Sequence, residues 1–127
     1  MIITFGRMRT FISFEEDDCR YTDSNIAAKA LSLYPLLSVH SCINSKGPTF
    51  GTVIDSTSIA HLIEHLMIAE QSKMAADKGF TDVTFVGMTQ WIDERAGLAE
   101  VQVSFIDDLD AVHALSKAVE AVKGFVE

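Results

Sequence analysis

Hydrophobic and polar residues alternate along this chain with two periods, one typical of strands and the other typical of helices. The clearest strand pattern covers 100–106, where Val101, Val103 and Phe105 alternate with polar residues. One face of this strand is therefore predicted to pack in the core, and the other to be solvated or to join a polar site. Further strand patterns occur at 36–43 and 81–89, and two short strands or one hairpin are predicted within 1–14.

Two segments in the first half of the chain repeat apolar residues at helical spacing. The first, 24–34, follows the capping-type residues Thr22 and Asp23 and stops before Pro35. The second and longest is predicted to begin at Asp55 or Ser56 and to run to about residue 77, where a glycine at 79 can end it.

A third helix is predicted near the end of the chain, from a cap at Asp107 or Asp108 to Gly124. Its apolar stripe is predicted to consist of Val112, Leu115, Val119 and Val122. Strands and helices in this order predict an α+β fold, a two-layer sandwich of a mostly antiparallel sheet with helices on one face.

The composition indicates an ordered globular protein. The chain has 127 residues, of which 48% are hydrophobic and 22% charged, which predicts a single domain over 1–127. A net charge of −8 with scattered basic residues disfavours nucleic acid as a partner. No targeting signal or membrane-spanning apolar run is recognisable, so we expect a cytoplasmic protein with no membrane partner. Cys19 and Cys42 are too few for a disulfide scaffold and are expected as reduced thiols.

A candidate metal motif, His61-Leu62-Ile63-Glu64-His65, lies within the longest predicted helix. Residues four apart on a helix share a face, so His61 and His65 are able to bind one ion. Glu64 is placed to act as general base on water whose pKa a bound zinc ion lowers. On a helical projection all three lie away from the stripe that Ile59 marks. The H-x-x-E-H spacing is the inverted form of a metallopeptidase motif. The alternative is three ordinary residues on a solvated helix face.

A zinc site needs at least a third protein ligand. His40 and Cys42, two positions apart in a predicted extended segment, point to the same side and are the candidates. Cys42 is either a ligand or a small buried hydrophobic residue. His40 is either a ligand or a residue that orients one. Thr89 and Trp91 are expected to line a substrate cleft, with core packing as the alternative for Trp91.

The segment PLLSVHSCINSKGPTFGTVIDSTSIAHLIEHLMIAEQ, residues 35–71, resembles the N-terminal domain of cyanophycin synthetases. In that family an H-x-C segment and a glycine-containing loop precede an H-x-x-E-H helix. A wider resemblance is to pitrilysin-like peptidases and to S-ribosylhomocysteine lyase. The resemblance implies a stand-alone, metallohydrolase-like domain in which His61 and His65 are ligands and Glu64 is the acid/base, with Cys42 and His40 beside the site.

These observations together favour a zinc-dependent hydrolase that acts on peptide or amide bonds. The resemblance extends the expected substrates to a cyanophycin-like polymer. The alternative is a binding or scaffolding module that retains a metal site without catalysis, and a metal-dependent lyase is a third hypothesis. A small peptide or polymer substrate is the expected partner. A symmetric homodimer is a further expectation, because a second copy would supply another wall to the cleft.

Overall fold

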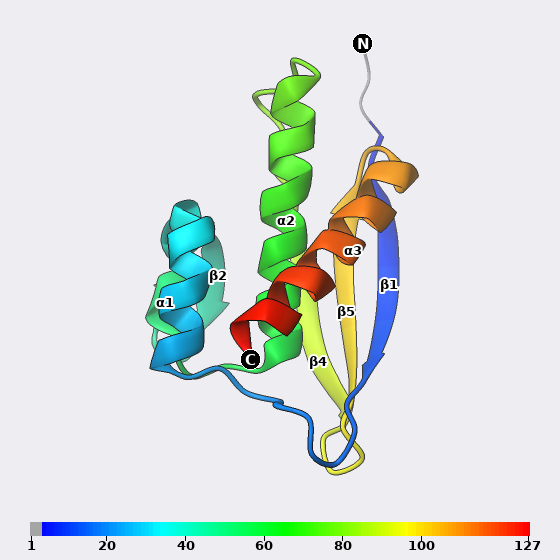
Figure 1. Cartoon of the computed structure of the whole chain (residues 1–127). Helices are drawn as coiled ribbons and strands as arrows, with labels where there is room; N and C mark the ends of the chain where they lie inside the picture. The colour runs from blue at the N-terminus through cyan, green and yellow to red at the C-terminus, as the bar shows by residue number, and fades with distance from the viewer. Residues whose placement is uncertain (1–3) are drawn as a thin grey trace.

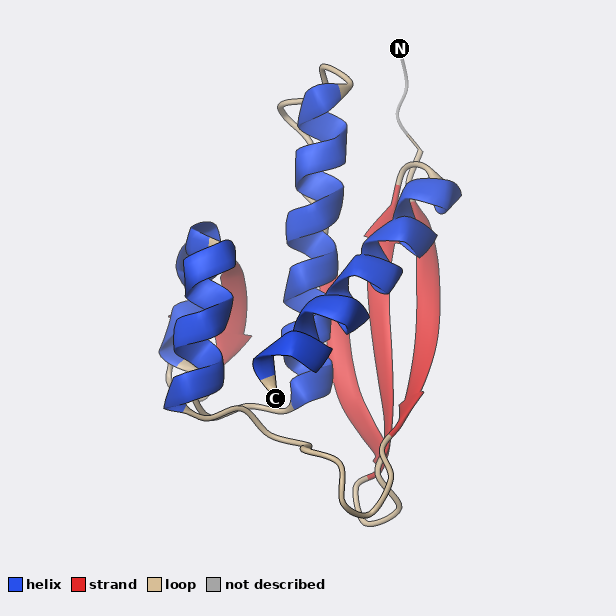
Figure 2. Cartoon of the chain, viewed as in Figure 1, coloured by secondary structure: helices blue, strands red, loops and turns tan. Residues whose placement is uncertain are grey.

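Three α-helices and five strands make up the part of the chain that the computed structural model describes, residues 4–127 (Figures 1 and 2). An antiparallel sheet has the order β1-β5-β4, and β2 and β3 form a separate antiparallel hairpin. The strands are β1 (Gly6–Ser13), β2 (Ser41–Asn44), β3 (Gly47–Thr49), β4 (Gly87–Asp93) and β5 (Leu98–Phe105). The α-helices are α1 (Ser24–Leu33), α2 (Ile59–Asp77) and α3 (Asp108–Phe125), and two short 3₁₀ helices are η1 (Pro35–Val39) and η2 (Phe50–Thr52). The predicted α+β class is thus confirmed.

Helices α2 and α3 lie on one face of the three-stranded sheet (Figure 1). Ala99, Val101 and Val103 of β5 are each 1% exposed, because they face these helices. This arrangement is consistent with the predicted two-layer sandwich. Helix α1 and the β2–β3 hairpin stand beside α2, away from the three-stranded sheet (Figure 2).

The polar face of β5 is less solvated than its alternation suggests. Glu100 is only 1% exposed, because side chains from both neighbouring strands cover it. Arg9 Nη2 of β1 lies 2.5 Å from a Glu100 carboxylate oxygen, and Gln90 Nε2 of β4 donates to the other oxygen at 2.7 Å. These partners satisfy the charge of a carboxylate that would otherwise be costly to bury.

The apolar stripe predicted for α3 is right in part. The buried residues of α3 are Ala111, Ala114, Ala118, Val122 and Phe125. Of the predicted stripe, Val122 is buried and Leu115 and Val119 are partly buried against the core, whereas Val112 is 57% exposed. Small alanines let two helices approach closely, and a pattern search that gives weight to large side chains passes over them.

The ends of the helices were predicted more accurately from capping residues than the ends of the strands were from hydrophobic patterns. Helix α1 begins after Asp23, whose Oδ1 accepts from Ile26 N–H at 2.8 Å, as predicted. Helix α2 begins at Ile59, capped by Ser58, and not at Asp55 or Ser56. Gly79, with φ +89°, provides the predicted left-handed residue after this helix.

Two predicted strands are shifted. Within 36–43 the chain first forms η1 and then β2, because Pro35 opens a 3₁₀ turn. Within 81–89 only the last three residues belong to β4, which continues to Asp93. Its register with β5 starts at Gly87, which pairs with Val103. In the first segment the structure shows one strand from Gly6, and residues 1–3 of the predicted pair lie outside the described part. None of the helices within residues 4–127 combines the length and apolarity needed to cross a bilayer.

Candidate metal centre

Helix α2 brings His61 and His65 together on the side that faces β2. The two ring centroids lie 5.0 Å apart, as expected for residues one helical turn apart. Ser58 fixes the start of the helix at this point, because its Oγ accepts a hydrogen bond from the backbone N–H of His61 at 3.1 Å. Phe50 of η2 stacks on the ring of His65, with centroids 4.0 Å apart and an interplanar angle of 16°.

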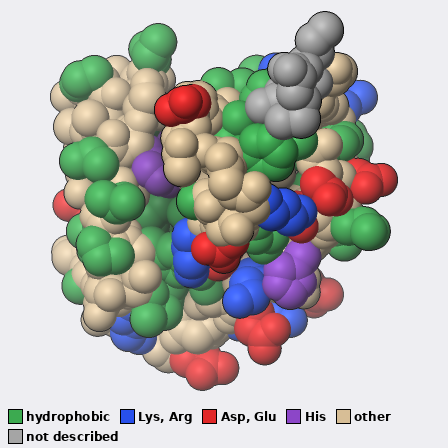
Figure 3. All heavy atoms as spheres, turned by 90° about the horizontal axis from the view of Figure 1, so that it is seen from above, with side chains coloured by type: hydrophobic (Ala, Val, Ile, Leu, Met, Phe, Trp, Pro, Cys, Tyr) green, Lys and Arg blue, Asp and Glu red, His purple; other side chains and the backbone are tan. Residues whose placement is uncertain are grey.

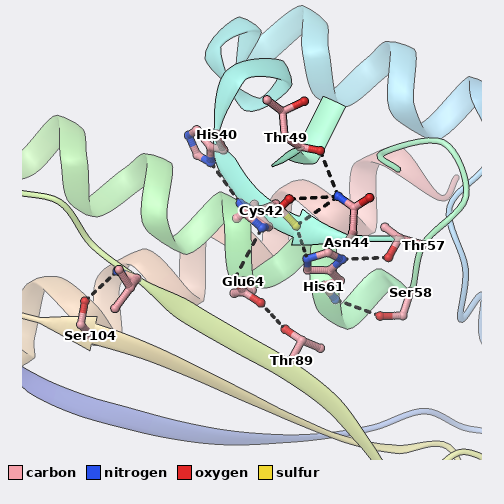
Figure 4. A network of polar contacts seen from close by, with 12 residues as sticks. His40, Cys42, Asn44, Thr49, Thr57, Ser58, His61, Glu64, Thr89 and Ser104 are labelled. Atoms are coloured by element: carbon pink, nitrogen blue, oxygen red, sulfur yellow. Dashed lines mark hydrogen bonds and ion pairs between the residues drawn. The ribbon is translucent and has the colours of Figure 1, made fainter. Parts of the chain in front are cut away.

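Strand β2 adds the thiol of Cys42 to this pair (Figure 4). Cys42 Sγ lies 3.5 Å from His61 Nε2. One ligand atom from each of Cys42, His61 and His65 lies within 4.8 Å of the other two, so this group could hold a metal ion. The residues on β2 and α2 that the sequence identified as ligand candidates are therefore brought together by the fold.

In both histidines Nδ1 contacts a supporting side chain and Nε2 is left for an ion. Nδ1 of His61 contacts Thr57 Oγ1 at 2.8 Å, which leaves Nε2 directed at the thiol. Nδ1 of His65 contacts His40 Nδ1 at 3.2 Å. Its Nε2 is buried and has no hydrogen-bond partner among the described residues. A buried nitrogen without a partner is costly, and an ion bound there would satisfy it.

The electrostatics favour neutral imidazoles, the form that binds metals. Burial lowers the pKa of His61 to about 4 and that of His65 to about 3, where the neighbouring histidines also contribute. Burial also raises the pKa of the Cys42 thiol, so metal binding at neutral pH would release its proton. A donor set of one sulfur and two imidazole nitrogens fits zinc and other borderline ions.

His40 does not join the three-residue group. Its ring contacts the His65 ring, with centroids 5.4 Å apart, and burial lowers its pKa. Of the two roles considered for His40, the geometry matches the orienting one, because its Nδ1 faces the nitrogen of His65 that points away from Glu64.

Glu64 lies beside the ligand group and is also buried. One carboxylate oxygen is 3.5 Å from His65 Nε2, and the other accepts a hydrogen bond from Thr89 Oγ1 at 2.7 Å. Burial raises the pKa of Glu64 to about 7, although the Thr89 hydrogen bond lowers it. Exposures of 4% for Glu64 and 2% for His65 show that the alternative of a solvated helix face is wrong. No residue of α2 from Ile59 to Gln71 is exposed, whereas several near its C-terminal end are.

Three supporting residues were not identified from the sequence. Thr57 holds the His61 ring, as described above. Asn44 Nδ2 donates to the Cys42 carbonyl at 3.1 Å and lies 3.7 Å from its sulfur. Gly87 of β4 leaves room for Glu64, since a Cβ at that position would lie 2.7 Å from Glu64 Cγ. Thr57 and Asn44 follow from no spacing rule, whereas a glycine at a strand position is a recognised sign of close approach.

Two cavities adjoin the centre. A cavity of about 700 Å³ is lined by the candidate ligands, Glu64 and residues 83–89. A second, of about 340 Å³, lies on the other side of His61. Thr89 lines both, and Trp91 lines the smaller one while its ring packs against Phe14 at 5.9 Å between centroids. Trp91 therefore packs against the core, as the alternative interpretation predicted, and also lines a cavity.

Comparisons of the chain with protein-family models, with curated proteins and with solved structures found no match. What the site can do follows from its own residues and their geometry.

Proposed function

We propose that this protein is a zinc-dependent hydrolase that cleaves a peptide or related amide bond, with Glu64 as its general base. The observation that carries the proposal is a set of three candidate ligands, Cys42, His61 and His65, with a buried carboxylate beside them and a large cavity in front. Catalytic zinc sites have three protein ligands and one open position, whereas structural sites have four protein ligands. Within residues 4–127, the group whose ligand atoms lie within 4.8 Å of one another has three members, as a catalytic site requires.

A zinc ion bound here would act as a Lewis acid toward a carbonyl group and a water molecule. The chain's own contribution is proton transfer by Glu64. Its carboxylate takes a proton as the water oxygen bonds to the carbonyl carbon, and delivers it to the amide nitrogen as the C–N bond breaks. Thr89 donates to one carboxylate oxygen and so leaves the other, near His65, for this exchange. The resemblance to metallohydrolase helices with the same motif supports this assignment.

Zinc analysis of protein purified without chelator tests the metal. We expect close to one zinc ion per chain, and its loss in both His61→Ala and His65→Ala. His113→Ala, on the exposed side of α3, is the matched control and should keep the ion. Retention of zinc by the double variant of His61 and His65 would rule out this centre.

Glu64→Gln tests catalysis separately. The variant keeps the shape and the hydrogen bond from Thr89 but removes the base. Zinc content should be unchanged while turnover falls by roughly 10²–10⁴-fold, the usual contribution of a general base. A binding module that retains a metal site is the competing function. It would be supported if the wild-type protein cleaves no amide and if His40→Ala loses zinc as readily as His61→Ala, because His40 would then be a fourth ligand.

A further inference from the structure

The two cavities beside the metal centre meet at the same two side chains. His61 and Thr89 line both the larger cavity of about 700 Å³ and the smaller one of about 340 Å³. Figure 4 shows His61 of α2 beside Cys42, and Thr89 of β4 beside Glu64. A molecule bound at the centre can therefore extend in two directions, one part into each cavity.

Beside the three histidines of the metal centre, the larger cavity has an apolar wall and no lysine or arginine among its lining residues. Its apolar side chains are Ile43, Ile68, Val83, Phe85, Val86 and Met88. Among its lining residues in the described chain, Glu64 is the one with a carboxylate, and it is held by Thr89. Three of these side chains are largely exposed, with Ile43 at 98%, Val86 at 51% and Met88 at 42%. An apolar substrate group would cover this surface, whereas a charged group would find no lysine, arginine or second carboxylate to pair with among the lining residues.

The smaller cavity has aromatic and hydroxyl-bearing walls. Trp91 and Tyr21 lie with ring centroids 6.0 Å apart on one side, and Ser56, Thr57 and Ser58 line another side. Besides Glu64, three charged side chains of the described chain contact lining residues here, and all are already engaged. Lys46 Nζ donates to Ser56 Oγ at 2.7 Å, Glu94 accepts a hydrogen bond from the Tyr21 hydroxyl, and Glu100 accepts one from Gln90 Nε2 at 2.7 Å.

We infer that the substrate is an uncharged amide, with an apolar group in the larger cavity and a flat or aromatic group beside Trp91 in the smaller one. This inference rests on the proposed function, because it places the scissile amide where the cavities meet. Apolar burial in one cavity and aromatic packing in the other supply the binding energy. Arginine-rich and aspartate-rich polymers, which the family resemblance suggests, are disfavoured by both cavities.

Binding to zinc-loaded Glu64→Gln protein tests the inference without turnover. Trp91 is the only tryptophan of the chain, so its fluorescence reports on the smaller cavity directly. The probes are acetyl-Leu-Phe-amide and its counterparts with Asp or Arg in either position. We expect a saturable fluorescence change with the neutral peptide and at least tenfold weaker binding of every charged one. Equal affinities, or no binding of the neutral peptide, would overturn the inference.

A pair of charge insertions places the apolar group in the larger cavity. Ser72 is exposed on α2 and lines that cavity, whereas Ser116 is exposed on α3 and lines neither cavity. Ser72→Asp should strengthen binding of acetyl-Arg-Phe-amide several-fold, and Ser116→Asp should leave it unchanged. The same response in both variants would contradict the placement. Failure of the proposed function has a different signature, namely absence of zinc or of cleavage in the wild-type protein.

Discussion

At the scale of single residues, the metal centre depends on which nitrogen each histidine keeps free. Thr57 and His40 each contact an Nδ1 atom, and both Nε2 atoms are thereby left for an ion. The sequence identified His61 and His65 because residues four apart share a helix face, a rule that needs no tertiary information. It did not identify Thr57, because the contact depends on how the loop before α2 folds back on the helix. Which nitrogen of each histidine is free for a metal ion is therefore determined by the tertiary fold.

Replacing Thr57 by Val should weaken zinc binding by roughly 10–100-fold, the usual effect of losing a residue that orients a ligand. The valine keeps the size of the side chain and removes only the hydroxyl that contacts His61. Competition with a chromophoric chelator measures the change. Thr57→Ser should retain most of the affinity, because serine keeps the hydroxyl that contacts His61. Equal weakening by both variants would contradict the role of the hydroxyl.

Gly87 controls the position of the Glu64 carboxylate. A methyl group at Gly87 would lie 2.7 Å from Glu64 Cγ and 2.8 Å from Oε2, closer than carbon atoms approach in folded proteins. Gly87→Ala should therefore displace the carboxylate and lower turnover by about 10²-fold, as displacements near 1 Å do. Zinc content should be unchanged. Gly124→Ala, where a Cβ meets nothing within 4 Å, is the control and should keep full activity.

At the scale of elements, the sequence predicts helices better than strands because helix signals are local. The caps of α1 and α3 were each predicted to within two adjacent residues, of which the structure shows Asp23 and Asp107, since a side chain that accepts from a nearby backbone N–H needs only its neighbours. The start of β4 was placed too early, because the end of a strand depends on where its partner begins to pair. For the same reason the buried face of α3 was predicted only in part, because the alanines at its contact with α2 are explained only by the neighbouring helix.

The N-cap of α2 also helps to position the metal centre. Ser58 caps the helix and holds the backbone of His61 one turn before the second histidine. Ser58→Ala should lower the free energy of unfolding by about 1 kcal/mol, as loss of an N-cap hydroxyl usually does. Urea denaturation of the metal-free protein measures this change. Ser58→Asp should retain most of the stability, because its carboxylate can accept the same hydrogen bond. Ser116→Ala, within α3 and exposed, should be nearly neutral.

At the scale of the whole molecule, the metal centre joins two parts of the fold. Cys42 and His40 come from the segment of α1, η1 and the β2–β3 hairpin, and the remaining groups come from α2 and the sheet (Figure 1). Seen from above, hydrophobic side chains gather on the side of α1 and β2 (Figure 3). Those most exposed there are Leu33, Leu36, Val39 and Ile43. An ion bound to residues of both parts would stabilise their contact, so zinc should raise the melting temperature.

Burial of Glu64 against this centre has a stability cost that depends on pH in the metal-free protein. Burial raises the pKa of Glu64 from 4.5 to about 7. The folded protein therefore keeps the proton up to about pH 7, whereas the unfolded chain releases it near pH 4.5. The contribution of Glu64 is fully present below pH 4.5 and is lost as pH rises through about 7, which makes the folded state less stable at pH 8.

Glu64→Gln removes this ionisation while keeping the acceptor for Thr89. In chelator-treated protein the variant should therefore be more stable than the wild type at pH 8, and its advantage should shrink steadily as the pH falls to 5. The full pKa shift corresponds to about 3 kcal/mol, so the effect is large enough for urea denaturation at several pH values. His61 and His65 titrate in both proteins and cancel in the difference. Glu120→Gln, at an exposed position of α3, is the control for the same substitution away from the centre. A Glu64→Gln advantage that is the same at pH 5 and pH 8 would mean that burial does not shift this carboxylate. A pKa of Glu64 near neutral pH would then have to come from a source other than burial.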